Sequence, residues 1–228
     1  MKKTLLAGLA LGLMLLGTVG VASATSVAVG NAGFENGKVL YAPWVKTTGI
    51  VGLEGFFKPT AAMIAPNGTL WAASLNAGTV PIVPPAIGNG GIHQTLGETY
   101  DGNFDYTLSF FAGSRLDIPP SLPVSFSAEL KANGNILAQL NGVIPSNQGT
   151  WNPYSLTLSS NMVGDFIGQN IEIWFTNTSQ FGELGGYNQL VLDNVSLDKN
   201  NPVPEPATML LFGTGLVGLA GISRRRKK

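Results

Sequence analysis

The sequence predicts an all-β module with a β-sandwich fold over residues 25–198. Apolar and polar residues alternate in short runs, most clearly from Val124 to Lys131, which places one face of a strand in a core and the other in water. Turn formers are abundant, with 30 glycines and 14 prolines among 228 residues, and cysteine is absent. The lack of cysteine excludes a disulfide framework, thiol catalysis and thiolate metal sites, so a packed core must stabilise the module.

The region between the two termini is expected to form roughly nine or ten short strands separated by turns, as in sandwich folds. The expected strands are 26–29, 69–75, 92–96, 106–110, 124–131, 136–140, 151–158, 171–175 and 189–197, and 49–57 is a further apolar run. Asn133-Gly134 predicts a hairpin turn, because both residues tolerate positive φ. Residues 76–91 contain three prolines, and a loop of this length suggests either a lid over a binding face or a surface insertion.

The N-terminus has the three parts of a secretory signal peptide, predicted as residues 1–24. Lys2 and Lys3 give a basic start, residues 5–21 form an apolar run, and Ala22-Ser23-Ala24 provides a cleavage site of small residues. We expect a signal helix that signal peptidase removes after Ala24. The alternative is an N-terminal anchor that stays uncleaved.

The C-terminus predicts a short transmembrane helix followed by a basic tail. Residues 207–222 carry no charge, and a helix of that length spans about 24 Å, less than the ~30 Å hydrocarbon core. Residues 199–203 form a polar linker before Pro204-Glu205-Pro206, which leaves this motif accessible. The five cations after the apolar run favour the cytoplasmic side, so the module is expected outside the cytoplasm. These cations are Arg224, Arg225, Arg226, Lys227 and Lys228.

Pro204, Glu205 and Pro206, the apolar span and the basic terminus together resemble the PEP-CTERM sorting signal of Gram-negative bacteria, here residues 204–228. The resemblance implies that an exosortase, a membrane protease, recognises the motif and removes the tail. It also implies an inner-membrane intermediate, a final location at the cell surface or outside the cell, and an association with exopolysaccharide. The alternative from the residues alone is an ordinary single-span anchor.

The net charge of zero conceals an acidic module. Seven of the 13 basic residues lie in the two terminal segments, whereas all 13 acidic residues lie between Thr25 and Pro206, which gives that part of the chain a net charge of −7. Binding to nucleic acid requires a basic face that contacts phosphates. An acidic and sparsely charged module therefore excludes nucleic acid as a partner.

Four segments of the module occur in an order typical of one fold. They are Asn31 to Glu35, Gln94-Thr95-Leu96 leading to Tyr106–Phe110, Gly149 to Tyr154, and Leu192 to Leu197. They resemble, in turn, the opening N-x-x-F-E motif, the central strand pair, the T-W-x-x-Y strand entry and the closing D-N-V-x-L strand of carbohydrate-binding-type jelly rolls with the galactose-binding-like fold. The resemblance implies a jelly-roll β-sandwich but no particular activity, because this fold hosts many roles.

The same resemblance implies a structural calcium ion, with Glu35 and Asp193 as ligands and backbone carbonyls completing the shell. Calcium prefers such hard oxygen ligands. Asp193 has the parity of Val191, Val195 and Leu197 and is expected to point toward the apolar side, where a carboxylate needs a partner or a metal. Alternatively, Asp193 caps a turn or accepts hydrogen bonds from backbone amides.

Trp44 and Trp174 are the candidate sugar contacts, because sugar rings stack on aromatic faces. Trp44 follows a proline in an expected loop, and Trp174 alternates with apolar residues and is expected to point outward. Tyr41 and Tyr187 are candidate neighbours of this site. Aromatic residues in a sandwich more often fill the core, which is the role expected of Trp151.

No catalytic constellation is visible in the sequence. His93 is the only histidine, and an isolated histidine in a strand is expected to be structural or to lie at the surface. Glu98, Asp101 and Asp105 lie close together. In a turn rich in glycine and asparagine they suggest a solvated loop or a second calcium loop, rather than the carboxylate pair of a glycoside hydrolase.

These features predict an exported surface or matrix protein that is not an enzyme. We expect a non-catalytic binding module, with polysaccharide as the candidate ligand. One alternative is a purely structural matrix or adhesion protein without a small-ligand site, and a less favoured one is an enzyme that acts on glycosides. Asn177 and Asn194 begin N-x-S/T sequons, which the bacterial sorting signal predicts to stay unmodified.

Overall fold

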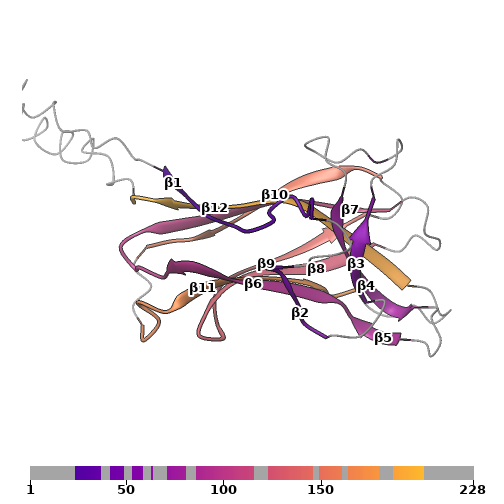
Figure 1. Ribbon diagram of the computed structural model, residues 1–228, viewed down its shortest axis with the longest axis horizontal. Coiled ribbons are helices and arrows are strands. Elements are labelled where there is room, and N and C mark those ends of the chain that lie inside the picture. The colour runs from indigo at the N-terminus through magenta and orange to yellow at the C-terminus, as the bar shows by residue number, and fades with distance from the viewer. Residues whose placement is uncertain are drawn as a thin grey trace, which may run out of the picture. The chain divides into compact units, whose positions relative to one another are not determined.

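The computed structural model contains two antiparallel β-sheets that form two layers (Figure 1). It describes residues 24–36, 42–48, 53–58, 63, 71–80, 86–115, 123–145, 149–160, 164–179 and 187–202. Within these residues, Ala24–Asn200 form one compact unit. The predicted all-β fold, a jelly-roll β-sandwich, is confirmed.

The two sheets differ in size. The larger is a seven-stranded sheet with the path β10-β7-β12-β4-β3, in which β1 also pairs with β12 and β5 with β4. Its strands are β1 (Ala24–Val27), β3 (Glu54–Phe57), β4 (Ala72–Val80), β5 (Ala86–Asn89), β7 (Asp105–Ser114), β10 (Trp151–Leu158) and β12 (Tyr187–Asn200). The five-stranded sheet has the order β2-β6-β11-β8-β9. Its strands are β2 (Val45–Lys46), β6 (Gly91–Thr99), β8 (Val124–Ala132), β9 (Asn135–Ile144) and β11 (Asn170–Asn177).

The core lies between the inner faces of the two sheets. In β11 the side chains of Ile171, Ile173 and Phe175 are fully buried and alternate with more exposed ones, as the period of two predicts. Phe110 of β7 contacts aromatic rings from both sheets, with its centroid 4.9 Å from that of Phe175 and 5.6 Å from that of Tyr154. Burial of these side chains is the main favourable term that holds the two layers together.

The β8–β9 hairpin closes at the predicted turn. Asn133 and Gly134 have φ values of 48° and 74°, the left-handed conformation that a two-residue hairpin turn of this type requires at both positions. Asparagine and glycine adopt this conformation at little steric cost. The turn therefore fixes the register in which Ala132 lies opposite Asn135.

The stretch 76–91 differs from the irregular loop that its prolines suggested. It contains the end of β4, all of β5 and the start of β6, and β4 pairs with β5 from Ala77 opposite Asn89 to Val80 opposite Ala86. The three prolines all lie at 81–85, between the two strands, where a missing N–H donor does not interrupt the ladder. The expectation of one long lid or insertion is wrong for the part of this stretch that the structure describes.

The first and last strands of the module are neighbours. β1 runs antiparallel to the end of β12, with Ala24 opposite Asn200 and Val27 opposite Leu197, and Figure 1 shows the two strands side by side. Only Val27 of β1 is buried. The strand therefore serves mainly to pair the backbone edge of β12, which would otherwise be an open edge.

The expected terminal segments lie outside the described residues. They are the signal helix 1–24, apart from Ala24 itself, the sorting motif 204–206, the helix 207–222 and the basic tail 224–228. Among the residues that the structure describes, no helix is long and apolar enough to cross a membrane.

Candidate functional site

The loop of residues 31–36 is shaped by two residues with positive φ. Asn31 and Phe34 have φ values of 46° and 55°, and the Phe34 N–H donates to the Asn31 carbonyl at 3.0 Å. The Asn36 N–H donates to Asn31 Oδ1 at 3.2 Å, and Trp44 Nε1 donates to the Asn31 carbonyl at 3.2 Å. The side chain of Phe34 is fully buried, so the loop is pinned to the core.

The predicted ligand Asp193 approaches this loop at Gly33, and the other predicted ligand, Glu35, belongs to the loop itself. A Cβ atom at Gly33 would lie 3.7 Å from Glu35 Cγ and 3.8 Å from Asp193 Oδ1. Asp193 is fully buried, and its Oδ1 accepts the Asn194 N–H at 2.7 Å. The Val195 N–H donates to the Ala32 carbonyl at 3.0 Å, which ties the closing strand to the loop.

Asp193 is buried, as its parity with Val195 predicted, but it lies on the opposite face of β12 from Val195. The pairing of β12 with β7 shifts register between Asp193 and Ser196, and Asn194 has a φ of 51°, so a bulge resets the alternation. Val195 belongs to the main core, whereas Val191 packs with a separate small cluster. Asp193 shares the side of Val191 and not that of Val195.

The donor set at this loop fits a calcium ion. Asp193 Oδ1 and the side chain of Glu35 both lie next to Gly33, and carboxylate oxygens are the hard ligands that calcium prefers. Glu35 Oε1 also accepts the Trp71 N–H at 3.3 Å. In the described part of the chain, no group of three or more His, Cys, Asp or Glu side chains could hold a metal. A cation here would therefore bind two carboxylates and backbone oxygens.

Trp44 lies in the core and not at an exposed loop. It is only 2% exposed, and its ring lies 5.4 Å from that of Phe34 and 6.0 Å from that of Phe175, measured between centroids. A buried ring cannot offer a face to a sugar, so the expected exposure of Trp44 is wrong. The side chains of its expected neighbours Tyr41 and Tyr187 lie outside the described residues.

Trp174 points outward from the five-stranded sheet, but both of its ring faces are covered. His93 of β6 stacks on it with centroids 4.2 Å apart, and Lys131 of β8 places Nζ 4.1 Å from the ring centroid. β6 and β8 flank β11 on opposite sides, so the two contacts lie on opposite sides of the ring. Trp174 Nε1 donates to Glu172 Oε2 at 2.7 Å. The indole therefore presents an edge, and not a face, to solvent.

The His93 imidazole completes this stack. Burial lowers the pKa of His93 from its usual 6.5, nearby Glu172 raises it, and Lys131 lowers it. Its Nδ1 is buried without a hydrogen-bond partner. His93 thus belongs to a packed row on the outer face of the sheet.

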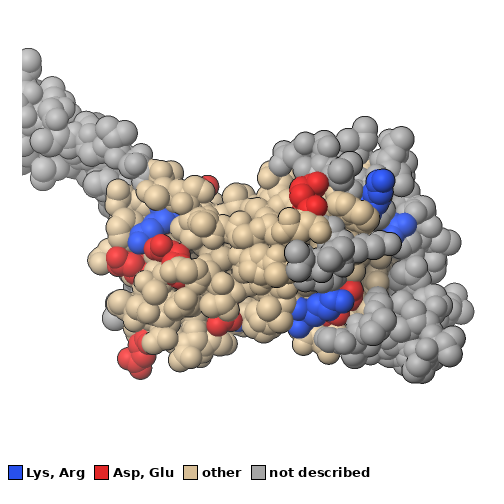
Figure 2. Space-filling model, viewed as in Figure 1, with Lys and Arg blue, Asp and Glu red and all other residues tan. Residues whose placement is uncertain are grey.

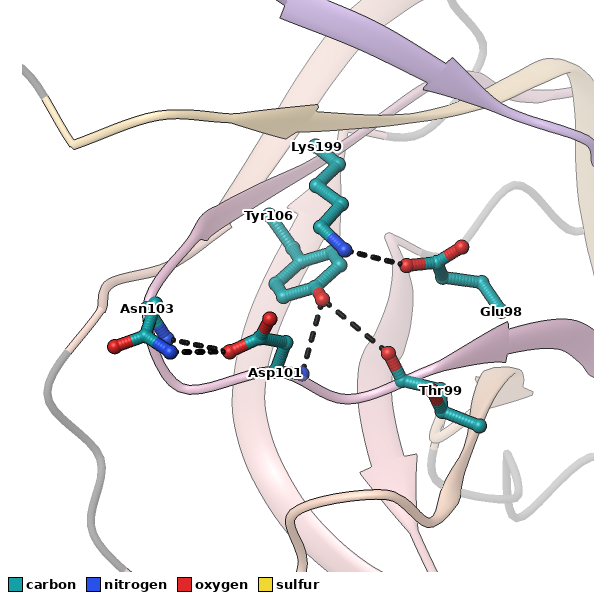
Figure 3. A network of polar contacts seen from close by, with 6 residues as sticks. All are labelled: Glu98, Thr99, Asp101, Asn103, Tyr106 and Lys199. Atoms are coloured by element: carbon teal, nitrogen blue, oxygen red, sulfur yellow. Dashed lines mark hydrogen bonds and ion pairs between the residues drawn. The ribbon is translucent and has the colours of Figure 1, made fainter.

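The carboxylates of the expected second calcium loop each have a partner of their own. Asp101 Oδ1 accepts the backbone N–H and Nδ2 of Asn103 at 3.0 and 2.8 Å (Figure 3). Asp105 Oδ1 accepts the Ser160 N–H. Glu98 forms an ion pair with Lys199 at 2.8 Å. These contacts favour a hydrogen-bonded turn over a shared metal site.

Tyr106 lies at the centre of this network. Its hydroxyl accepts the Asp101 N–H at 3.1 Å and donates to the Thr99 carbonyl at 3.4 Å (Figure 3). Lys199 Nζ lies 5.8 Å from the Tyr106 ring centroid and 4.2 Å from that of Phe104. Burial raises the pKa of the Tyr106 hydroxyl above 10.0. The network joins the end of β12 to the β6–β7 turn.

The sequon at Asn177 is not available for modification. Asn177 is fully buried, and its Nδ2 donates to the carbonyls of Leu75 at 2.9 Å and Asn188 at 3.2 Å. This nitrogen is the one that a glycan would have to occupy. It instead links β11 to the opposite sheet.

Glu54 is the residue that the sequence did not identify. It is the first residue of β3 and is 3% exposed. Its Oε1 accepts Thr48 Oγ1–H at 2.7 Å, the Thr48 N–H at 3.3 Å and the Gly91 N–H at 3.2 Å. Its Oε2 is buried and has no partner. The available signal was a single carboxylate inside the apolar run 49–57.

Charged groups are sparse on the module. Figure 2 shows a face on which acidic and basic side chains are scattered singly or in small groups over a mostly uncharged surface. On the described part of this face, the isolated charges form no continuous basic surface for a polyanion. The contacts described above, and not a charged patch, therefore define the candidate sites.

The C-terminal segment matches a known motif. A family model described as the PEP-CTERM protein-sorting motif matches residues 202–227. This confirms the predicted sorting signal and marks the protein as exported. The motif implies processing by exosortase, a membrane protease of a pathway typical of Gram-negative bacteria.

Several solved structures share the fold. A Stig cyclase of Fischerella sp. TAU in complex with (3Z)-3-(1-methyl-2-pyrrolidinylidene)-3H-indole is 21% identical, with a TM-score of 0.59 over 78% of this chain and 98% of that chain. A cyclase from Fischerella sp. TAU in complex with 4-(1H-indol-3-yl)butan-2-one is 21% identical, with a TM-score of 0.57 over 77% and 97%. The α-L-arabinofuranosidase MgGH51 is 16% identical, with a TM-score of 0.52 over 76% of this chain and 26% of that chain. Among curated proteins, none matches the chain.

The prediction that the protein is not an enzyme is wrong. It rested on the lack of a visible catalytic constellation, but residues that contact one another in this fold can lie far apart in sequence, as Glu54 and Gly91 do. The similar cyclase structures share the fold of this module. The HpiC1-like family model, described as HpiC1 cyclase, matches residues 25–198, and the chain therefore belongs to this family.

Proposed function

We propose that the exported module binds a small aromatic, nitrogen-containing ligand of the indole type and promotes ring closure on it. The observation that carries the proposal is the match of residues 25–198 to a cyclase family. The ligands in two similar structures, an indole bearing a pyrrolidine ring and an indolyl ketone, suggest the substrate class. A buried carboxyl group such as that of Glu54 is the type of residue that binds or protonates such a ligand.

Ring closure within one molecule leaves its mass unchanged, which gives a direct assay. The full-length chain, solubilised in a neutral detergent, is incubated with a panel of 3-alkenylindoles, and the products are separated by chromatography and weighed by mass spectrometry. We expect an isomer of unchanged mass and new retention time that forms faster than with heat-unfolded protein. Failure to form an isomer from any member of the panel would contradict the proposed reaction.

A structural calcium ion at Glu35 and Asp193 is part of this proposal. The position of Asp193 Oδ1 and of the Glu35 side chain beside the same residue, Gly33, supports it. The ion would supply charge that holds loop 31–36 against β12, and both carboxylates and nearby carbonyls would bind it. A ligand present at 100 times its dissociation constant adds about 2.7 kcal/mol to the free energy of unfolding.

Thermal unfolding in calcium and in EGTA tests the metal. The midpoint is expected to rise with calcium in the native chain and in Asp198→Asn, which changes a carboxylate on the same strand. The variant Asp193→Asn is expected to lose the response. Glu35→Gln serves as a second variant if the buried Asp193 position does not tolerate substitution. Equal midpoints in calcium and EGTA for the native chain would exclude the metal.

Polysaccharide binding is a second candidate function, favoured by one feature. Five residues lie in register across all strands of the five-stranded sheet and form a row on its outer face: Val45, His93, Trp174, Glu129 and Gln139. The row combines an indole edge with carboxylate, amide and imidazole groups. It would contact an extended glycan through hydrogen bonds rather than through ring stacking.

Affinity electrophoresis in gels containing glycans, including the exopolysaccharide of the host, tests this candidate. Retarded migration of the native chain is expected, and Gln139→Ala should reduce it. Thr157→Ala, on the exposed side of β10 in the other sheet, is the matched control. Unchanged migration in every glycan would leave a structural matrix or adhesion role as the alternative to the cyclase.

We also propose that the tail is removed. The predicted linker 199–203 begins inside β12, which ends at Asn200, so residues 201–203 separate the strand from Pro204-Glu205-Pro206. The expected helix 207–222 would anchor the chain only until cleavage. Signal peptidase would act after Ala24, at the start of β1. Mass spectrometry of the mature protein tests both steps, and a product that still contains Lys228 would show that the tail is kept as an anchor.

A further inference from the structure

The carboxyl group of Glu54 is only half satisfied. All three hydrogen bonds that the structure gives it go to Oε1, from Thr48 and Gly91. Oε2 is buried with no partner. An unpaired buried carboxylate oxygen is unfavourable, because the group loses its water without replacement. Each such atom in a native protein therefore requires a specific explanation.

Glu54 Oε2 also differs in kind from the other unpaired atoms. In the part of the chain that the structure describes, four further buried side-chain atoms lack a partner, and all four are nitrogens. They belong to Asn31, His93, Trp151 and Asn152. Glu54 Oε2 is thus the one acidic oxygen in this set. An acidic oxygen selects a hydrogen-bond donor, and most strongly a cationic one.

The orientation of this oxygen is fixed in advance. Thr48 follows the end of β2, and Gly91 is the first residue of β6. The strands β2 and β6 belong to the five-stranded sheet, whereas Glu54 begins β3 in the other sheet. Donors from two separate segments hold Oε1, so the carboxyl group cannot rotate without breaking them. A group held in one orientation loses little conformational entropy on binding a ligand, which favours affinity.

A cation already contacts the backbone of Glu54. Lys46 Nζ donates to the backbone carbonyl of Glu54 at 3.3 Å, and Lys46 is half-buried while Thr48 is exposed. The backbone of Glu54 thus already accepts a hydrogen bond from an ammonium group. The preceding residue in the chain, Leu53, is apolar and fully buried.

We propose that Glu54 Oε2 binds the ammonium group of a small organic amine whose apolar body packs against the neighbouring core. This deepens the proposed function, on which it rests, by naming amines as the substrate class of the cyclase. Binding itself involves no covalent step: the ammonium donates to Oε2, and Oε1 keeps its present donors. Glu54 is then the residue that selects the ligand by charge.

Calorimetric titration of the full-length chain in neutral detergent at pH 7 tests the proposal. The probe is tryptamine, and its neutral counterpart is tryptophol, in which a hydroxyl replaces the ammonium group. The native chain is expected to bind tryptamine at least about tenfold more tightly than tryptophol, because a charge-assisted hydrogen bond is roughly twice as strong as a neutral one. Equal affinities, or no binding of tryptamine, would overturn the proposal.

Two variants separate charge recognition from a purely structural role. Glu54→Gln keeps an oxygen for Thr48 and Gly91 and is expected to bind tryptamine as weakly as tryptophol. Lys46→Met removes a neighbouring positive charge and is expected to tighten tryptamine binding about two- to fivefold. If Glu54→Gln does not fold, the affinity of Lys46→Met for tryptamine and the native chain's preference for tryptamine over tryptophol still test the proposal. Unchanged tryptamine affinity in Lys46→Met would contradict the placement of the ammonium.

The test is distinct from that of the proposed function. Tryptamine lacks an alkenyl chain and cannot close a ring by itself, so the titration reports binding alone. Charge-selective binding without any isomer from the alkenylindoles would retain the amine site and exclude the reaction. Isomer formation with no preference for tryptamine would retain the reaction and exclude Glu54 as the binding residue.

Discussion

Two polar clusters lie at opposite ends of β6, and they differ in how completely they are hydrogen-bonded. At the Thr99 end, the hydroxyl of Tyr106 both accepts and donates a hydrogen bond, and Glu98 pairs with Lys199 (Figure 3). At the Gly91 end, Glu54 has three bonds on one oxygen and none on the other. The first cluster is hydrogen-bonded within the module, whereas the second leaves one buried carboxyl oxygen without a partner.

The difference suggests how stability and binding are divided in this module. A fully paired network makes the protein more rigid and gains nothing from a ligand. A fixed but half-paired carboxyl group is unfavourable in the unliganded protein and is stabilised when a donor arrives. Substitutions at Tyr106 should therefore change stability, and substitutions at Glu54 should change binding.

The largest expected effect on stability is that of Tyr106→Phe. The hydroxyl is buried, and its loss leaves the Asp101 N–H and the Thr99 carbonyl without their partner. We expect a decrease of about 1–3 kcal/mol in the free energy of unfolding, measured by urea denaturation. Tryptamine binding should not change. A decrease below 0.5 kcal/mol, roughly the smallest value measured for one hydrogen bond, would show that the network is not a stabilising element.

Glu54→Gln should have a smaller effect on stability. The amide oxygen can still accept from Thr48 and Gly91. The amide nitrogen takes the position of Oε2, which has no hydrogen-bond partner in the native chain either. We expect a change of less than about 1 kcal/mol in the same urea experiment. A loss larger than that of Tyr106→Phe would reverse the comparison and indicate that Glu54 is structural.

Lys199→Met should have a similarly modest effect. The ion pair with Glu98 is partly exposed, with 21% and 30% of the two side chains accessible, and such pairs contribute about 0–1 kcal/mol. The hydrogen bond to Glu98 raises the pKa of Lys199 above 10.5. The stability that it contributes is therefore full below that pH and is lost as pH rises through the raised pKa. Urea denaturation at pH 7 and pH 11 should show a smaller alkaline loss in Lys199→Met than in the native chain.

The smallest effect is expected at His93. Burial lowers the pKa of His93 below 6.5, so the folded protein favours the neutral imidazole. Its contribution to stability is present above pH 6.5 and is lost as pH falls through the lowered pKa. Tryptophan fluorescence should follow the same titration, because the ring stacks on Trp174. His93→Gln should abolish the titration, and a fluorescence change that persists in this variant would assign it to another group.

The strands and the hairpin turn were predictable because their signals are local. The alternation in β8 and the Asn133-Gly134 turn depend only on neighbouring residues. The sorting signal was likewise readable from three consecutive elements at the C-terminus. The pairing of β4 with β5 within residues 76–91 was not predicted, because the prolines between the two strands suggested a loop and the strand signal on either side is weak.

The sites could not be predicted because their partners are distant in sequence. Trp44 is buried by Phe34 and Phe175, which come from opposite ends of the module. Asp193 lies before a bulge, which reverses the parity that placed it with Val195. Glu54 becomes a candidate only when its hydrogen bonds are known. The sequence did not identify the enzyme family either, because residues that lie together in the fold are distant in sequence.

The most direct test of the account follows the amide of Gly91, which donates to Glu54 Oε1. The full-length chain is labelled with nitrogen-15, and the Gly91 resonance is recorded as tryptamine is added. Binding of an ammonium to Oε2 withdraws charge from Oε1, so the Gly91 amide proton should move upfield in a saturable manner, and tryptophol should shift it much less. A Gly91 resonance that stays in place at tryptamine saturation would contradict the assignment of Glu54 as the binding carboxylate.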